Sequence, residues 1–245
     1  MSIPLSFLKG LPSPPPGTSL GDLLAELVTD SGKFNTLLDC LCSTTDAALY
    51  SPDPLRPPLC HDELRAFVTN FVLPHSNRHK PLGPNDRVMI VLPTGPENAL
   101  ALLALASYHT CAPVNATCTA SELKDDAERL NVKALVTTSD AEDRLELQSL
   151  SEELGLEVIF IHGRPSEPAG LFDMSLMDET HGFPVYAEPR KPTRLHGLYD
   201  QSLVLHTSGT SGKKKVVPYT LQSLIVGTWA VVHSWDLQPS DVNSG

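Results

Sequence analysis

The sequence predicts an α/β fold in which parallel strands form a sheet with helices on both of its faces. From residue 84 onward, short apolar runs bounded by turn residues alternate with segments of helical periodicity. Such alternation is typical of βαβ units. The chain has 245 residues, of which 41% are hydrophobic and 19% charged, so it is long enough to bury a sizeable core.

The first eighty residues are less regular than the rest. Residues 1–18 form a proline-rich arm, and the remainder, residues 19–245, is expected to belong to one larger domain. Residues 19–43 carry two amphipathic stretches, and residues 50–58 form a proline-rich turn region. Residues 61–73 predict a helix, because their apolar side chains share one face. These side chains are Leu64, Phe67, Val68 and Phe71.

The middle of the chain contains the clearest alternation of strands and helices. The predicted strands cover residues 86–93, 111–117, 132–139 and 156–163. The predicted helices cover residues 95–109, 119–130 and 140–155. Pro96 suits the first turn of the first helix. Thr119 lies three residues before Glu122, which is the spacing of a capping box.

The last third begins with a long connection. Residues 163–200 contain several prolines and no clear periodicity, and such a connection either borders a site or is partly disordered. Residues 201–209 and 214–220 then predict two strands, and residues 221–235 predict a helix apolar enough to be buried. In a parallel sheet, ligands bind at the carboxyl ends of the strands.

Composition excludes several classes of function. The net charge of −11 argues against binding to a nucleic-acid backbone. No secretory signal is visible, and the apolar stretches are too short to span a bilayer, so a cytoplasmic protein is expected. The cysteines are odd in number and match no zinc pattern, so we expect buried free thiols and no metal site. They are Cys40, Cys42, Cys60, Cys111 and Cys118.

The stretch between the two last predicted strands has the chemistry of an anion-binding loop. Residues 207–215 read T-S-G-T-S-G-K-K-K. Gly209 and Gly212 allow backbone N–H groups to approach a ligand and form a nest. The neighbouring hydroxyl groups donate hydrogen bonds, and the lysines supply positive charge. These groups together suit a triphosphate.

Three other interpretations of this loop follow from its residues. It is not a Walker A loop, because Thr207 stands where that pattern needs glycine and Lys214 where it needs serine or threonine. Ser211 and Lys214 fit the S-x-x-K pattern of penicillin-binding enzymes, but the other motifs of that class are absent. On composition alone, a solvated hairpin loop stays open as an alternative.

The loop resembles the signature loop of the adenylate-forming (AMP-binding) superfamily, which includes acyl-CoA synthetases, luciferases and the adenylation domains of peptide synthetases. The usual form is T-S-G-T-T-G-x-P-K-G-V, from which Lys214 and Val216 depart, and Leu221 departs from the Thr-His that often follows the loop. The resemblance extends over residues 50–242. Further matching positions are Asp86, Arg87, Val88, Pro93, Pro113, Asn115, Glu122 and Leu123, together with the L-x-P-x-D-V pattern at 237–242.

The resemblance implies an ATP-dependent ligase. In this family the loop holds the β- and γ-phosphates of Mg-ATP while a small carboxylic acid attacks the α-phosphate. The acyl adenylate then passes its acyl group to a thiol of coenzyme A or of a phosphopantetheine carrier protein. The implied ATP-binding residues are Thr207, Ser208, Gly209, Thr210, Ser211, Gly212 and Lys215. Lys213 and Lys214 are expected on the solvent side, where they act only through their field.

Other family motifs do not occur in the sequence. The resemblance places an aromatic-G-x-T-E segment, a T-G-D aspartate and a C-terminal subdomain after the loop, and none is found here. We therefore expect an incomplete N-terminal part of the large domain, unable to complete the reaction alone. A non-catalytic pseudoenzyme or interaction module is the alternative. Residues 112–117, "APVNAT", favour an acyl-CoA synthetase over an amino-acid adenylation domain. Such a fragment would expose a sheet edge and apolar surface.

Overall fold

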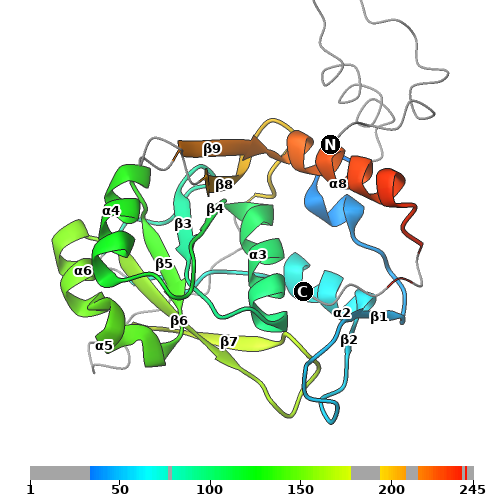
Figure 1. Ribbon diagram of the computed structural model, residues 1–245, viewed down its shortest axis with the longest axis horizontal. Coiled ribbons are helices and arrows are strands. Elements are labelled where there is room, and N and C mark those ends of the chain that lie inside the picture. The colour runs from blue at the N-terminus through cyan, green and yellow to red at the C-terminus, as the bar shows by residue number, and fades with distance from the viewer. Residues whose placement is uncertain (1–33, 77–78, 178–193, 208–214, 239–240, 242–245) are drawn as a thin grey trace, which may run out of the picture.

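The computed structural model describes residues 34–76, 79–177, 194–207, 215–238 and 241. Its main feature is a seven-stranded sheet (Figure 1). The strands are β3 (Arg87–Ile90), β4 (Thr110–Pro113), β5 (Ala134–Thr137), β6 (Glu157–Gly163), β7 (Phe172–Leu176), β8 (Gln201–Thr207) and β9 (Lys215–Thr220). Their order across the sheet is β7-β6-β5-β3-β4-β8-β9.

The five inner strands, from β6 to β8, are all parallel, and only the two edge strands are antiparallel to their neighbours. Three of the inner strands, β3, β4 and β5, have four residues each and are almost completely buried, as strands covered on both faces usually are. The prediction of an α/β fold around a parallel sheet is therefore confirmed.

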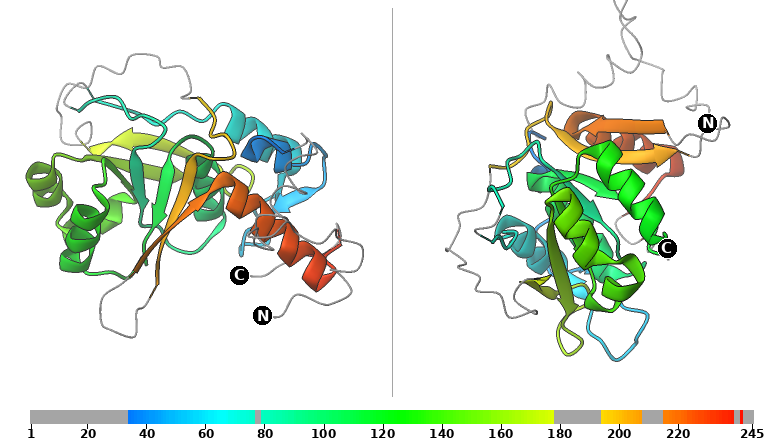
Figure 2. Two further views of the ribbon diagram at one scale, coloured as in Figure 1. Left: turned by 90° about the horizontal axis from the view of Figure 1, so that it is seen from above. Right: turned by 90° about the vertical axis from the view of Figure 1, so that its left-hand side faces the viewer.

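Helices cover both faces of the sheet (Figures 1 and 2). The helices α2 (His61–Thr69) and α3 (Pro96–Tyr108) lie on one face. On the other face lie α4 (Ala120–Leu130), α5 (Glu142–Leu145) and α6 (Leu147–Leu154). Because side chains alternate along a strand, Val88 and Ile90 of β3 pack with α3, while Met89 packs with α4. The sheet thus separates two apolar cores.

The two best-defined helix starts follow the sequence. Pro96 is the first residue of α3, where its missing N–H costs no hydrogen bond. The Thr119 hydroxyl accepts a hydrogen bond from the Glu122 N–H at 3.2 Å, and the Glu122 carboxylate accepts one from the Thr119 N–H at 2.9 Å. This confirms the predicted capping box.

The predicted single helix over 140–155 is wrong, because the chain breaks at Glu146. The segment forms a 3₁₀ turn (Ser139–Ala141), then α5 and α6, and Glu146 between the helices has φ = 51°. Leu145 and Leu147 are both fully buried. Two residues separated by two positions face different sides of a continuous helix, so the break lets both leucines reach the core.

The connection after residue 163 contains a strand that the sequence did not predict. The segment β7 pairs with β6 and closes one edge of the sheet. Its sequence, F-D-M-S-L, alternates apolar and polar side chains, and Phe172 and Leu176 are buried. Five residues with period two are a short signal beside a proline-rich loop. Residues 178–193 of the same connection lie outside the described residues.

The N-terminal region is only partly described. Residues 1–33, including the predicted arm and the first amphipathic stretch, lie outside the described residues. The second amphipathic stretch contains a short 3₁₀ helix (Leu37–Cys40). It is followed by two strands that were not predicted, β1 (Ala47–Leu49) and β2 (Leu59–Cys60), which pair antiparallel around the predicted turn region.

The cysteines are free, as predicted, but not all are buried. Cys111 and Cys118 are buried, whereas Cys40 and Cys42 are exposed and Cys60 is half-buried. Burial raises the pKa of the Cys111 thiol to about 12, so this side chain behaves as a small apolar core residue. The expectation of buried thiols is wrong for Cys40, the last residue of the 3₁₀ helix, and for Cys42, which follows it before β1.

The last helix, α8 (Leu221–Trp235), is less buried than the sequence predicted. Its first half packs through Leu221 and Ile225 against Phe34 and Leu37. Its second half leaves Trp235 62% exposed, with Val231 and Val232 exposed beside it. The expectation of a buried helix is therefore wrong for this half, and the expectation of exposed apolar surface is confirmed there. The helix begins beside the end of β9 and extends away from the sheet (Figures 1 and 2).

A loop before β7 is tied to the start of α3. The Arg56 guanidinium donates to the carbonyl groups of Arg164 and Pro168, each at 3.2 Å. Gly170 follows with φ = +91°, and a Cβ atom there would lie 2.9 Å from the Pro96 carbonyl oxygen. Only glycine fits this position, because both the dihedral angle and the space exclude a side chain.

We therefore predict that Gly170→Ala destabilises the protein by about 1–3 kcal/mol, from backbone strain and the contact with Pro96. The matched control is Gly227→Ala in α8, where an added Cβ meets nothing within 4 Å. Alanine is favoured over glycine inside a helix by about 0.8–1 kcal/mol, so this variant should be slightly more stable. Urea denaturation of both variants measures the difference. Equal stability of Gly170→Ala and the parent would contradict the assignment.

Candidate functional site

The predicted phosphate-binding loop connects β8 and β9. Thr207, the last residue of β8, lies opposite Lys215, the first residue of β9. Residues 208–214, which include Ser208, Gly209, Thr210, Ser211 and Gly212, lie outside the described residues. The structure therefore places the two ends of the predicted loop side by side, on adjacent antiparallel strands.

These ends lie at the carboxyl edge of the parallel sheet. Cys111 of β4 pairs with Leu203 of β8 in parallel register, so both strands end on the same side. The Thr110 hydroxyl fixes this register at the opposite edge by donating to the Gln201 carbonyl at 2.7 Å. Ligands of such sheets bind where the strands end, so the position of Thr207 and Lys215 is the one expected of a ligand site.

A buried histidine that the sequence did not single out holds the segment leading into β8. His196 is fully buried, and its Nε2 donates to the Pro84 carbonyl at 2.7 Å. Its Nδ1 lies 3.0 Å from the Ser202 hydroxyl, and its backbone N–H donates to the Ser107 carbonyl at 2.8 Å. Through its imidazole and its backbone N–H, His196 thus joins the loop before β3, the end of α3 and the start of β8. A lone histidine in an irregular stretch gave no pattern to detect.

The turn before β8 is held by a charged pair. Arg194 donates to both carboxylate oxygens of Asp200, at 2.6 and 2.9 Å, and the Gly197 N–H donates to the same carboxylate at 2.8 Å. The Arg194 hydrogen bonds, followed by the bond from Gly197, lower the pKa of Asp200 to about 2. The Asp200 carbonyl accepts from the Leu221 N–H at 3.0 Å, so the turn also positions the start of α8.

A second charged cluster lies near the carboxyl end of β8. Asp126 of α4 is buried, and its carboxylate pairs with Arg129 and lies 3.4 Å from Nδ1 of His206. An Nη atom of Arg129 lies 3.5 Å from Nε2 of the same imidazole. His206 immediately precedes Thr207, so this cluster adjoins the predicted site. Sequence reasoning did not identify it.

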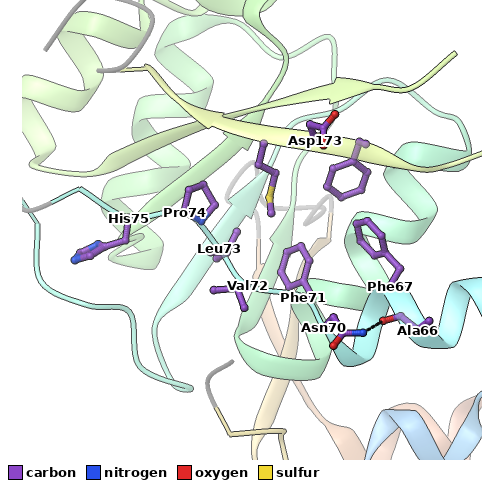
Figure 3. Close-up of a pocket in the computed structure, with 11 residues that line it drawn as sticks. Ala66, Phe67, Asn70, Phe71, Val72, Leu73, Pro74, His75 and Asp173 are labelled. Carbon is purple, nitrogen blue, oxygen red and sulfur yellow. Dashed lines mark hydrogen bonds between the residues drawn. The ribbon is translucent and has the colours of Figure 1, made fainter. Parts of the chain in front are cut away.

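A cavity of about 480 Å³ lies elsewhere, between α2 and β7. Figure 3 shows the rings of Phe67 and Phe71 directed toward β7, while the His75 imidazole points away from them. Phe172 and Met174 of β7 complete the apolar lining. Five strand spacings separate β7 from β8, which is roughly 24 Å at about 4.8 Å per strand. A molecule in this cavity could not react with one bound at the end of β8.

The described residues contain neither a candidate metal site nor a candidate membrane span. Within those ranges, no three histidine, cysteine, aspartate or glutamate side chains cluster as metal ligands would. Over the same part of the chain, no helix combines the length and apolar character that crossing a bilayer requires.

Comparison with known protein families gives one family match. A family model described as AMP-binding enzyme matches residues 78–243, which is two thirds of the chain. The matched range contains the parallel core of the sheet and both strands of the β8–β9 hairpin. The predicted loop therefore falls inside the part of the chain that the family model matches.

Solved structures show the same fold. Apo MatB from Rhodopseudomonas palustris superimposes with a TM-score of 0.62 at 22% identity, over 89% of this chain and 39% of that one. ATP-bound MatB from the same organism superimposes with a TM-score of 0.56 at 20% identity, over 85% of this chain and 39% of that one. An acyl-CoA synthetase from Brucella canis superimposes with a TM-score of 0.59 at 17% identity, over 97% of this chain and 40% of that one. The chain thus spans about two fifths of the length of these proteins.

The Asp200 pair generates a prediction about pH. Because folding lowers the pKa of Asp200 from 3.8 to about 2, the ionised pair stabilises the fold above about pH 4. That stabilisation is lost as the pH falls from 4 toward 2. The free energy of unfolding should therefore differ between the parent and Asp200→Asn near neutral pH, and the difference should shrink in acid. Asp140→Asn, which removes an exposed carboxylate, is the control. A difference independent of pH would contradict the prediction.

Proposed function

This chain belongs to the AMP-binding enzyme family, and we propose that its β8–β9 hairpin binds the β- and γ-phosphates of ATP. The observation that carries the proposal is the pairing of Thr207 with Lys215 at the carboxyl edge of the sheet. This pairing brings the first and last of the proposed ATP-binding residues together where α/β sheets bind their ligands. The ATP-bound MatB structure, with the same fold, supports a nucleotide site in this family.

The proposed contacts follow from the chemistry of the loop. Thr207, Ser208, Thr210 and Ser211 offer hydroxyl groups, and Gly209 and Gly212 allow backbone N–H groups to approach the phosphate oxygens. Lys215 is exposed on β9 and supplies a positive charge at the end of the loop. Against a net charge of −11, this local positive charge is needed to attract a triphosphate.

The proposed reaction is that of an adenylate-forming ligase. A small carboxylic acid would attack the α-phosphate of ATP and release pyrophosphate. The acyl group would then pass to a thiol of coenzyme A or of a phosphopantetheine carrier protein. The loop would contribute by holding and neutralising the phosphates, which is how proteins usually promote phosphoryl chemistry. Mg²⁺ would enter with ATP, because phosphate oxygens are its usual ligands.

The chain is proposed to supply only the phosphate-binding part of this machinery. It spans about two fifths of the solved relatives, and its sequence lacks the aromatic-G-x-T-E and T-G-D patterns of the family. The cavity between α2 and β7 lies too far from β8 to hold the reacting acid. We therefore propose that residues 1–245 bind ATP without completing adenylation. We also propose that the protein is located in the cytoplasm.

The second candidate is a non-catalytic module that has kept the fold. The exposed apolar end of α8, around Trp235, favours a role in which this surface contacts another protein. ATP binding does not separate the two candidates, because a pseudoenzyme can retain it. Turnover does separate them.

We predict that Lys215→Ala weakens Mg-ATP binding roughly tenfold, the amount expected for loss of one charge-assisted contact. Isothermal titration calorimetry measures the change. Lys133→Ala is the control, because Lys133 is an exposed lysine that bonds Asn131 before β5, at the opposite edge of the sheet. Equal ATP affinity in Lys215→Ala and the parent would overturn the phosphate assignment.

We also predict that purified residues 1–245 show no carboxylate-dependent exchange of pyrophosphate into ATP, even where they bind ATP. The measurement is the standard exchange of labelled pyrophosphate, with a range of small aliphatic and aromatic acids. Exchange above background with any of them would show that the chain forms the acyl adenylate by itself, and would also exclude the non-catalytic module.

A further inference from the structure

The face of α4 that packs against the sheet carries a buried carboxylate at a position where an apolar side chain would be expected. Leu123, Ala127 and Leu130 of this face pack into the core against the sheet. Asp126 lies among them, and its side chain is only 3% exposed. A buried carboxylate must be compensated by nearby donors, and a compensated pair is often no more stable than an apolar substitute. Stability alone therefore does not account for Asp126.

The compensation comes from two side chains that Asp126 holds in place. Arg129, one turn later on α4, pairs with one carboxylate oxygen, and Nδ1 of His206 lies 3.4 Å from the other. Nε2 of His206 faces the Arg129 guanidinium at 3.5 Å. Arginine can only donate, so this geometry fits an imidazole that donates from Nδ1 and accepts at Nε2. Each of the three side chains thus contacts the other two.

The cluster connects α4 to the end of β8. His206 precedes Thr207 and lies opposite Val216, while Thr207 lies opposite Lys215. Figures 1 and 2 show α4 beside the end of the sheet where β9 begins. The charged groups that contact the imidazole are Asp126 and Arg129, both on α4.

We propose that Asp126, Arg129 and His206 are positioning residues for the ATP phosphate site, which rests on the function proposed above. Asp126 orients the imidazole and the guanidinium, and His206 then fixes the end of β8 from which the phosphate-binding loop starts. A loop that must present several N–H and hydroxyl donors to one triphosphate binds well only if its ends are held. Hydrogen bonds to a rigid helix provide that restraint.

If Asp126 acts by positioning, its removal should change the ATP affinity in the direction opposite to the one that charge repulsion alone predicts. Removing a negative charge near a phosphate site should strengthen the binding of ATP. If Asp126 acts by positioning, Asp126→Asn should instead weaken Mg-ATP binding, roughly tenfold, which corresponds to about 1.4 kcal/mol. The matched control is Asp125→Asn, which removes an exposed carboxylate from the adjacent position of the same helix. That variant should bind ATP as well as the parent, or slightly better.

A second pair of variants, at His206, distinguishes loss of positioning from unfolding of the protein. His206→Phe keeps a ring of similar size but cannot bond Asp126 or Arg129, so it should also weaken binding roughly tenfold. His206→Gln carries an amide that can donate to Asp126 and accept from Arg129, so it should retain most of the affinity. Calorimetric titration of the full chain with Mg-ATP measures all variants, and their thermal unfolding is recorded in parallel.

The outcomes separate this inference from the proposed function. If the parent binds Mg-ATP and Asp126→Asn and His206→Phe, both folded, bind it equally or more tightly, the positioning role is wrong and the phosphate site stands. If the parent does not bind Mg-ATP, the proposed function fails and the inference falls with it. Weakened binding in both variants, with recovery in His206→Gln and no loss in Asp125→Asn, supports the positioning role.

Discussion

The parallel pairing of β8 with β4 is the constraint on which the candidate site depends. Through it a segment that begins almost ninety residues after β4 enters the same sheet, and the predicted loop reaches the carboxyl edge. Three sets of hydrogen bonds hold the start of β8 and the segment before it. They involve the Thr110 hydroxyl and Gln201, the buried imidazole of His196, and the Asp200 carboxylate. Each is a polar contact at the rim of an apolar core, where it fixes position more than it adds stability.

The sheet can supply this edge because it is buried on both faces. Two apolar cores with separate helices leave the strands few alternative registers, since a one-residue slip would exchange the side chains of the two faces. The β9 edge is different. There the first half of α8 packs against Phe34, Leu37 and Leu198, and Trp235 in its second half remains exposed. The part of the fold that would bind ATP therefore lies next to a helix that is only partly packed.

Most of the fold could be predicted because its signals are local. Pro96, the capping box at Thr119 and the apolar strands each act within a few residues, and the structure confirms them. The errors have a common physical origin in tertiary packing. The break at Glu146 exists because Leu145 and Leu147 both need the core, and β7 exists because β6 offers it an edge. Neither requirement is visible in a window of sequence.

The candidate site likewise contains residues that the sequence could predict and residues that it could not. Its loop could be predicted because the hydroxyl, glycine and lysine residues that suit a triphosphate are consecutive in the sequence. Asp126 and His206 are eighty residues apart, and in the sequence one is an ordinary helix residue and the other an ordinary strand residue. Only the placement of α4 beside β8 makes them partners. A phosphate loop needs both kinds of residue, since donors that contact the ligand bind strongly only when the rest of the structure holds their backbone in place.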